Sequence, residues 1–239
     1  MDPVTRSRAA EILARIERNS SPFFKKQMKA RFGINTQYAV GTPVTTLRLL
    51  LKAIPCPDQD LAEALWQTGV HEARILASMV ADPKQMTREK LDAWVKELNS
   101  WDICDLCCQN LFSKVKNPAK LAERWIKKED EYTRRAGFAV LCFLAAPRAK
   151  TTDEDLIKFL PLVKNHAADP RPMVYKAVNW ALRNIGKKNS KLTPHALTCA
   201  EDKNPRCITS TEQDIHHISR LTDRENGVYR CIYCDSKSN

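Results

Sequence analysis

The stretch RAGFAVLCFL, residues 135–144, decides the fold class of this chain. Its apolar side chains recur at the i, i+3, i+4, i+7 spacing that places them on one face of a helix. Residues 91–98 and 174–185 repeat the same period. Glycine is scarce, at 6 of 239 residues, and no stretch alternates polar and apolar residues for long. The sequence therefore predicts an all-α protein.

Prolines divide the helical pattern into successive pairs. We expect helix pairs near residues 59–81, 87–112, 118–144 and 154–186, at a spacing of about 30 to 40 residues, which is the period of HEAT-like repeats. Such repeats stack into a solenoid that buries each apolar face against the next repeat.

Three further helices are predicted before these pairs. They cover residues 3–18, residues 22–31 and a segment after Gly41, with Thr42 as its N-cap and Pro43 as its first helical residue. We expect a HEAT-like domain over residues 1–190. Residues 191–239 form a divergent polar segment, with short helices or partial disorder.

The composition narrows the partners and the compartment. The net charge of +11 and the pI of about 9.3 favour a polyanionic partner, with nucleic acid first. The alternative is that the positive charge only keeps the protein soluble. No run of roughly 18 apolar residues predicts a membrane span, and the charged N-terminus does not look like a secretory signal. Nine cysteines, an odd number, suit a reducing cytosol.

One polar residue opens the second helix of each pair. These residues are Arg74, Asp105, Arg135 and Lys176, and their equivalent positions predict one row along a concave basic face. Because Asp105 stands in a row of cations, we expect its pKa to be lowered.

Residues 171–188 contain five cations and no acid. Lys176, Trp180, Arg183 and Lys187 share one face of the expected helix, away from the apolar stripe, and Lys188 follows them. These cations could bind phosphates while Trp180 offers an aromatic plane to a sugar or base. The alternative is a tryptophan packed against the next repeat beneath a solvated basic face.

The stretch WDICD, residues 101–105, places Trp101 and Asp105 one turn apart, off the apolar stripe. Asp102 lies in the first turn of the expected helix, where a carboxylate complements the helix dipole. That explanation does not extend to Asp105, which would repel DNA. A catalytic role would explain its presence.

The segments LNSWDICDLC, EYTRRAGFAVL and YKAVNWALRNIGKKN, with the earlier GTPVTTLRLLLK, resemble the AlkD-type DNA alkylation-repair glycosylases. The resemblance covers roughly residues 20–190. It implies a HEAT-like fold that hydrolyses the N-glycosidic bond of N3- and N7-alkylated purines in duplex DNA. It also implies that Asp105 is the catalytic aspartate, that Trp101 and Trp180 are active-site tryptophans, and that Arg135 is the family's arginine.

The resemblance leads us to expect a monomer acting on alkylated duplex DNA in the cytoplasm, associated with the nucleoid in a bacterium. We expect DNA contacts from Arg135, Lys176, Arg183, Lys187 and Lys188, and no cofactor. The alternative is a non-catalytic HEAT-like module that binds DNA or protein. No family match is recognised beyond about residue 190.

Cysteine and histidine residues gather near the C-terminal end. Cys231 and Cys234 form a Cys-x-x-Cys motif, with Cys199, Cys207, His216 and His217 upstream. Such residues could be zinc ligands. Because their spacing is irregular and no second Cys-x-x-Cys exists, free cytosolic thiols are the interpretation we prefer, and we assign no metal site.

Overall fold

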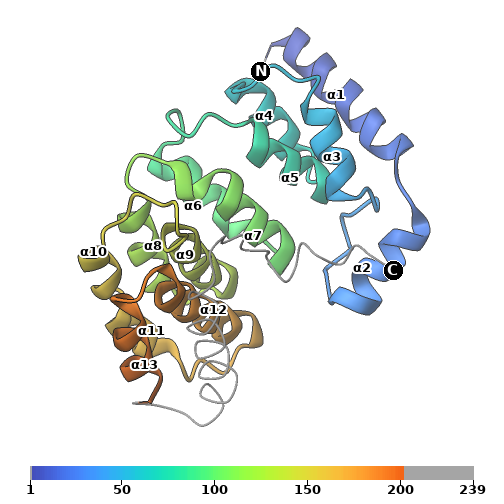
Figure 1. The fold of residues 1–239 in the computed structure, drawn as a ribbon. Helices are drawn as coiled ribbons and strands as arrows, with labels where there is room; N and C mark the ends of the chain where they lie inside the picture. Colours follow the sequence, from blue (N-terminus) through green and yellow to red (C-terminus); the bar gives the residue numbers. More distant parts are fainter. Residues whose placement is uncertain (1, 202–239) are drawn as a thin grey trace, which may run out of the picture.

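The computed structural model describes residues 2–201, and this part of the chain is helical throughout, without strands (Figure 1). Three N-terminal helices come first: α1 (Pro3–Arg18), α2 (Pro22–Phe32) and α3 (Val44–Leu51). The all-α prediction is confirmed, and the expected bounds of the first two helices agree with the structure to within one residue.

Four helix pairs follow and stack along a curved array (Figure 1). Each pair supplies a first helix to one layer and a second helix to the other, as a HEAT-like repeat does. The repeat prediction is thereby confirmed. The pairs are α4 (Gln59–Gln67) with α5 (His71–Val80), α6 (Arg88–Lys96) with α7 (Trp101–Asn110), α8 (Pro118–Ile126) with α9 (Glu131–Leu144), and α10 (Asp153–Ile157) plus α11 (Leu160–His166) with α12 (Pro172–Lys188).

Polar N-caps fix where several of these helices begin. Asp58, Thr87 and Asp130 each accept a hydrogen bond from the backbone N–H three residues later, which satisfies a donor that the first turn leaves open. The prediction that Thr42 caps α3 is wrong, because Pro43 occupies that position. The buried Thr42 hydroxyl instead donates to the Ile16 carbonyl at 2.7 Å, near the end of α1.

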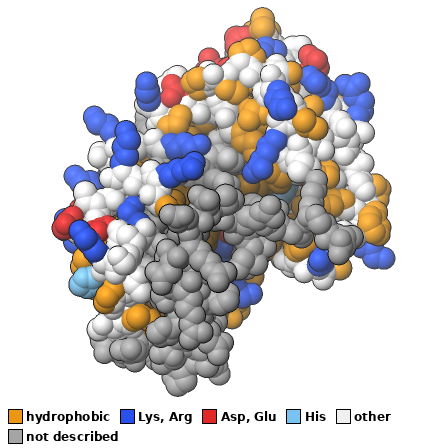
Figure 2. Space-filling view, in the orientation of Figure 1, with side chains coloured by type: hydrophobic (Ala, Val, Ile, Leu, Met, Phe, Trp, Pro, Cys, Tyr) orange, Lys and Arg blue, Asp and Glu red, His pale blue; other side chains and the backbone are white. Residues whose placement is uncertain are grey.

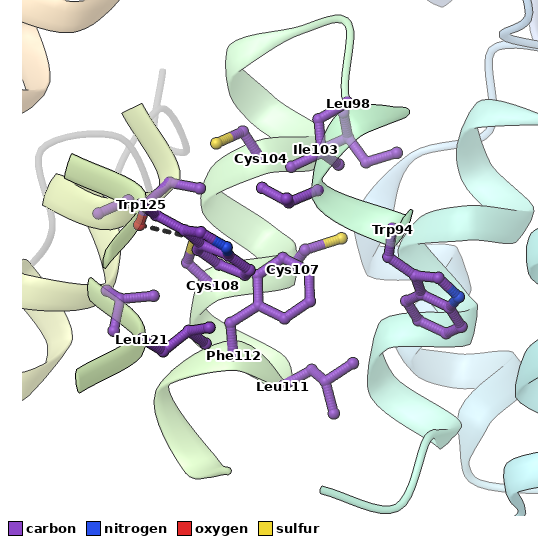
Figure 3. Close-up of a cluster of buried hydrophobic side chains, with 14 of the residues drawn as sticks. Trp94, Leu98, Ile103, Cys104, Cys107, Cys108, Leu111, Phe112, Leu121 and Trp125 are labelled. Carbon is purple, nitrogen blue, oxygen red and sulfur yellow. Dashed lines mark hydrogen bonds between the residues drawn. The ribbon is translucent and has the colours of Figure 1, made fainter. Parts of the chain in front are cut away.

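Aromatic contacts join successive repeats into one core. The rings of Trp66 and Trp94 stack with centroids 4.0 Å apart, which joins α4 to α6. Trp125 of α8 packs edge-on against Phe112, in the short 3₁₀ helix Phe112–Lys114, at 5.0 Å. Figure 3 shows these two side chains next to each other, with Leu121 nearby. Buried aromatic area of this kind is a large part of what stabilises a stack of repeats.

The helical core continues past residue 190. Helix α13 (Leu192–Glu201) packs on α12 and buries Leu192, Ala196 and Ala200 in the same core cluster. The domain boundary predicted at residue 190 stays a prediction, because most of the C-terminal segment lies outside the described residues. No helix among residues 2–201 is long and apolar enough to cross a membrane.

Gly137 allows α8 and α9 to approach closely. A Cβ atom at this position would lie 2.7 Å from the Ile126 nitrogen and 2.9 Å from the Ala122 carbonyl oxygen. Both atoms belong to the backbone of α8, so a side-chain rotation cannot relieve the contact. Glycine is therefore required here by packing, although it costs helix propensity.

We expect Gly137→Ala to lower the free energy of unfolding by about 1–3 kcal/mol, the usual cost of overpacking. Helix propensity alone would instead raise stability by about 1 kcal/mol. Urea denaturation measures the change. A stabilised variant would show that α8 and α9 can separate without cost, contrary to the packing found here.

Candidate functional site

Asp105 and Arg135 form a two-pronged ion pair between α7 and α9. Arg135 Nε donates to Asp105 Oδ1 at 3.0 Å, and Arg135 Nη2 donates to Asp105 Oδ2 at 2.8 Å. A third bond runs from Arg135 Nη1 to the Met173 carbonyl oxygen at 2.6 Å, at the start of α12. The Arg135 guanidinium therefore ties together the second helices of three repeats.

The Asp105 carboxyl is mostly removed from solvent, with 20% of its side chain exposed. Burial raises the pKa of Asp105 to about 6, and the attraction of Arg135 offsets only part of this effect. The expectation of a lowered pKa is therefore wrong, because it considered neighbouring charges without desolvation. With a pKa near 6 the carboxyl is still mostly ionised at neutral pH.

The two tryptophans implied by the resemblance are both half-buried. Trp101 packs against a small cluster of Met28, Ile34 and Ala39, and its indole nitrogen donates to the Phe32 carbonyl oxygen at 2.9 Å. It thereby attaches α2 to α7.

Trp180 meets the ring of Phe143 edge-on, with centroids 5.6 Å apart and planes at 87°. The packed-tryptophan alternative accounts for this contact. The Trp180 side chain is only partly buried by this packing.

The predicted DNA-binding cations differ in how they are held. Lys176 is exposed, whereas Arg183 and Lys187 are half-buried on the same helix. The ammonium of Lys188 donates to the Ala146 and Ala149 carbonyls, at 3.3 and 3.1 Å, just beyond the end of α9. A structural role accounts for Lys188, because a cation there complements the end of the helix dipole.

The predicted row of equivalent residues is wrong at Arg74. Arg74 Nε donates to the Trp66 carbonyl at 3.3 Å, and Arg134 Nε donates to the Ile126 carbonyl at 3.1 Å. In both cases the acceptor lies eight residues earlier, at the end of the preceding first helix. Arg74 therefore corresponds to Arg134 and not to Arg135, so it lies one position out of register with the others.

Asp102 has a partner that the sequence pattern did not indicate. Its Oδ2 lies 2.8 Å from Nε2 of the buried His71. Burial raises the pKa of Asp102, but His71 outweighs it, so the net shift is downward. For His71 burial lowers the pKa, and Asp102 reverses this to a net increase. The helix-dipole explanation of Asp102 is therefore incomplete.

Lysine and arginine side chains are spread over much of the face shown in Figure 2. Acidic side chains appear there in fewer places. The pattern agrees with the net charge of +11 and suits a polyanionic partner.

The zinc alternative rests on residues that lie almost entirely outside the described part of the chain. Cys207, His216, His217, Cys231 and Cys234 lie outside the described residues. Between residues 2 and 201 no group of three or more His, Cys, Asp or Glu side chains could hold a metal ion. Cys199 lies on α13, where its thiol points to the Leu160 carbonyl at 3.6 Å.

Two protein families match the chain. The family described as DNA alkylation repair enzyme matches residues 12–211. The family described as aspartate carbamoyltransferase regulatory chain, metal binding domain, matches residues 196–239. The matches overlap in and beyond α13, so the resemblance to repair enzymes extends further than residue 190.

Individual proteins show the same two resemblances. A solved structure described as a new family related to the HEAT-like repeat DNA glycosylases, with affinity for branched DNA structures, superposes with a TM-score of 0.75 at 22% identity. The superposition covers 90% of this chain and 93% of that one. The aspartate carbamoyltransferase regulatory chain of Clostridium botulinum strain Hall is 64% identical over 106 residues, which are 42% of this chain and 70% of the relative. That of Clostridium acetobutylicum is 32% identical over 105 residues.

The ion pair makes a stability prediction. Arg135→Ala leaves the Asp105 carboxylate buried without its partner, which should lower the free energy of unfolding by about 3–5 kcal/mol at pH 7.5. The double variant Arg135→Met with Asp105→Leu should lose much less, since no charge stays buried. Urea denaturation of all three proteins measures this.

The effect of pH provides a check. An unpaired buried carboxyl takes up a proton more readily in the folded state, so the loss in Arg135→Ala should shrink as the pH falls toward 5. If the single and double variants lose the same free energy of unfolding, and the loss does not change with pH, the role assigned to the ion pair is contradicted.

Proposed function

We propose that this chain, which belongs to the DNA alkylation repair enzyme family, is a DNA glycosylase. Its C-terminal end belongs to the family of aspartate carbamoyltransferase regulatory chains. Its substrate is duplex DNA with N3- or N7-alkylated purines, and the reaction hydrolyses the N-glycosidic bond. The single observation that carries the proposal is the ionisable Asp105 carboxyl, held by Arg135 where the second helices meet.

The chemistry needs one carboxylate. An N3- or N7-alkylated purine is already cationic, so it leaves without a general acid. The barrier then comes from positive charge that develops on the deoxyribose. A fixed carboxylate beside the anomeric carbon stabilises that charge and orients the attacking water. Asp105 suits this role because it is mostly ionised at neutral pH and cannot rotate freely between two guanidinium bonds.

The tryptophans supply apolar and cation-attracting surfaces. Trp101 precedes Asp105 by one turn of α7, and Trp180 lies on α12, the helix to which Arg135 is bonded. An indole face attracts a cationic base or sugar and excludes water from the reacting bond. We assign Trp101 and Trp180 to this role, each anchored by the protein contacts described above.

DNA binding is assigned to the basic face of α12. Lys176, Arg183 and Lys187 would contact phosphates, and such contacts release counterions, so affinity should fall steeply with salt. Lys188 is left out because its ammonium is engaged with the end of α9. The expected monomer and the cytoplasmic or nucleoid location belong to the same proposal.

The alternative function is a HEAT-like module that binds DNA or protein without catalysis. The pairing of Asp105 with Arg135 supports it, because a neutralised carboxylate stabilises a cationic sugar less well. The related solved structure is described as having affinity for branched DNA, and that property could extend to this chain. Release of an alkylated base separates the two functions.

We expect Asp105→Asn to lower the single-turnover rate of 3-methyladenine and 7-methylguanine release by roughly 10²-fold or more, the scale seen when one preorganised electrostatic group is lost. Binding to the same duplex should change little, because the side-chain shape is kept. A wild-type protein that releases no base from any alkylated duplex would establish the non-catalytic alternative.

Asp169→Asn is the matched control. Asp169 is also bound by arginines, namely Arg134 and Arg171, so its loss breaks a comparable ion pair. The folded fraction of that variant should release bases at the wild-type rate. In the wild type the rate should fall as the pH drops through about 6, because protonation removes the Asp105 charge. A flat profile between pH 5 and 7 would contradict the assignment.

A second function, metal binding, is favoured by the C-terminal match to a metal binding domain. The match favours zinc over the free thiols that the residue spacing suggested. Cys207, Cys231 and Cys234 would supply thiolates, and a fourth ligand would come from the remaining cysteine and histidine side chains. Four such donors would fill a tetrahedral zinc site of the structural type.

Metal content tests this second function. The full chain, loaded with zinc and dialysed, should retain one zinc ion per molecule by plasma mass spectrometry, since a closed thiolate site holds zinc tightly. Cys231→Ser with Cys234→Ser should abolish retention. Cys56→Ser, which removes an exposed cysteine far from this segment in the sequence, should not. A wild-type chain without bound zinc would overturn it.

A further inference from the structure

Residues 114–128 carry a concentrated positive charge on the outside of the repeat array. Six cations face one acid, Glu123, so the segment has a net charge of +5 within a chain of +11. Five of the six cations are exposed, and Arg124 is half-buried. The cations are Lys114, Lys116, Lys120, Arg124, Lys127 and Lys128.

Four of these cations line a depression on α8. The helix buries Leu121, Ala122, Trp125 and Ile126, so its other face is turned to solvent. On that face Lys120, Glu123, Arg124, Lys127 and Lys128 line an open depression of about 510 Å³. We call the residues that line this depression, together with Lys116 two residues before α8, the α8 surface.

The other first helices do not have this charge. Counted with similar flanking residues, the segment around α4 (55–69) carries three acids and no cation, and the segment around α6 (84–98) carries four cations against three acids. The segment around α10 and α11 (149–168) carries three of each. A solvated helix face usually mixes the two signs, as α6 does. Solubility therefore does not require the excess charge at α8.

Ion pairs within the protein neutralise only part of the charge. Arg124 pairs with Asp92, and Lys127 pairs with Glu123 at 2.7 Å. Among residues 2–201, Lys116, Lys120 and Lys128 take part in no ion pair. Three ammonium groups are thus exposed together and available to an anion.

The α8 surface and the Asp105 site lie on different sides of α9. Gly137 of α9 contacts the backbone of α8, whereas Arg135, two residues earlier, contacts α7 and α12. Residues two apart on a helix point in nearly opposite directions. A straight duplex lying on the Asp105 side would therefore leave the α8 surface uncovered.

We propose that the α8 surface binds the phosphate backbone of a second DNA duplex segment, so that the protein holds two segments on opposite faces. The proposal rests on the DNA-binding part of the function proposed above and does not require catalysis. Lysine ammonium groups form point-charge contacts with phosphates without reading base sequence. Binding at this surface should therefore depend on salt and on DNA geometry rather than on sequence.

The test compares two DNA probes of equal length and composition, a linear duplex and a four-way junction. The variant Lys116→Gln, Lys120→Gln and Lys128→Gln should bind the junction about 10-fold or more weakly at constant salt, with a salt slope lower by about 0.9 for each lost contact. Binding to the linear duplex and the rate of base release from it should be unchanged. Circular dichroism confirms that the variant is folded.

The control variant removes the same charge elsewhere, through Lys52→Gln, Lys84→Gln and Lys150→Gln, which are all exposed. It should bind the junction as the wild type does. Three results would overturn the proposal: an unchanged affinity of the α8 variant for the junction, an equal loss in the control, or an equal loss on the linear duplex. If the wild type binds phosphatidylserine vesicles but not the junction, and the α8 variant loses the vesicle binding, the partner would be a membrane instead.

Base release is measured separately, so the two proposals can fail independently. If the protein binds the junction through the α8 surface but releases no base, this inference holds and the glycosylase proposal fails.

Discussion

The buried guanidinium of Arg135 is the constraint on which the arrangement of the second helices depends. Its three bonds reach Asp105 on α7 and the Met173 carbonyl on α12, while its own backbone belongs to α9. A buried charge is tolerated only when its donors are satisfied. The spacing of these three helices is therefore fixed by the geometry of one planar guanidinium. The carboxylate that pairs with it, Asp105, is also the one to which we assign the catalytic role.

Polar clamps of a related kind recur where the repeats turn. Arg74 and Arg134 each donate to a carbonyl at the end of their own first helix, and each reaches a carboxylate of the following repeat, Glu97 and Asp169 respectively. A solenoid has no closed core, so stacked apolar faces alone leave the rotation of one repeat on the next weakly defined. Directional ion pairs between neighbouring repeats supply that definition.

The sequence predicted the helix pairs well because periodicity depends only on residue type and order. It misplaced Arg74 because Arg134 and Arg135 are adjacent, and only the carbonyl that each one reaches distinguishes them. It could not separate Lys188 from Lys176, since two lysines on one basic helix look alike until the end of α9 is seen beside one of them. The His71 partner of Asp102 had no local signal, because the two residues come from different repeats.

The ionisation of Asp105 required structure for the same reason. Neighbouring cations, visible in the sequence, lower the pKa of a carboxyl, but burial raises it, and burial depends on every helix around the site. Burial has the larger effect and raises the pKa of Asp105 to about 6, which leaves a carboxylate that is charged at neutral pH and close to its titration. A carboxylate held this way combines a fixed position with a charge that is weakly solvated, and weak solvation strengthens its attraction for a cationic sugar. Desolvation thus makes the Asp105 charge costly to keep and, for the same reason, effective in stabilising a transition state.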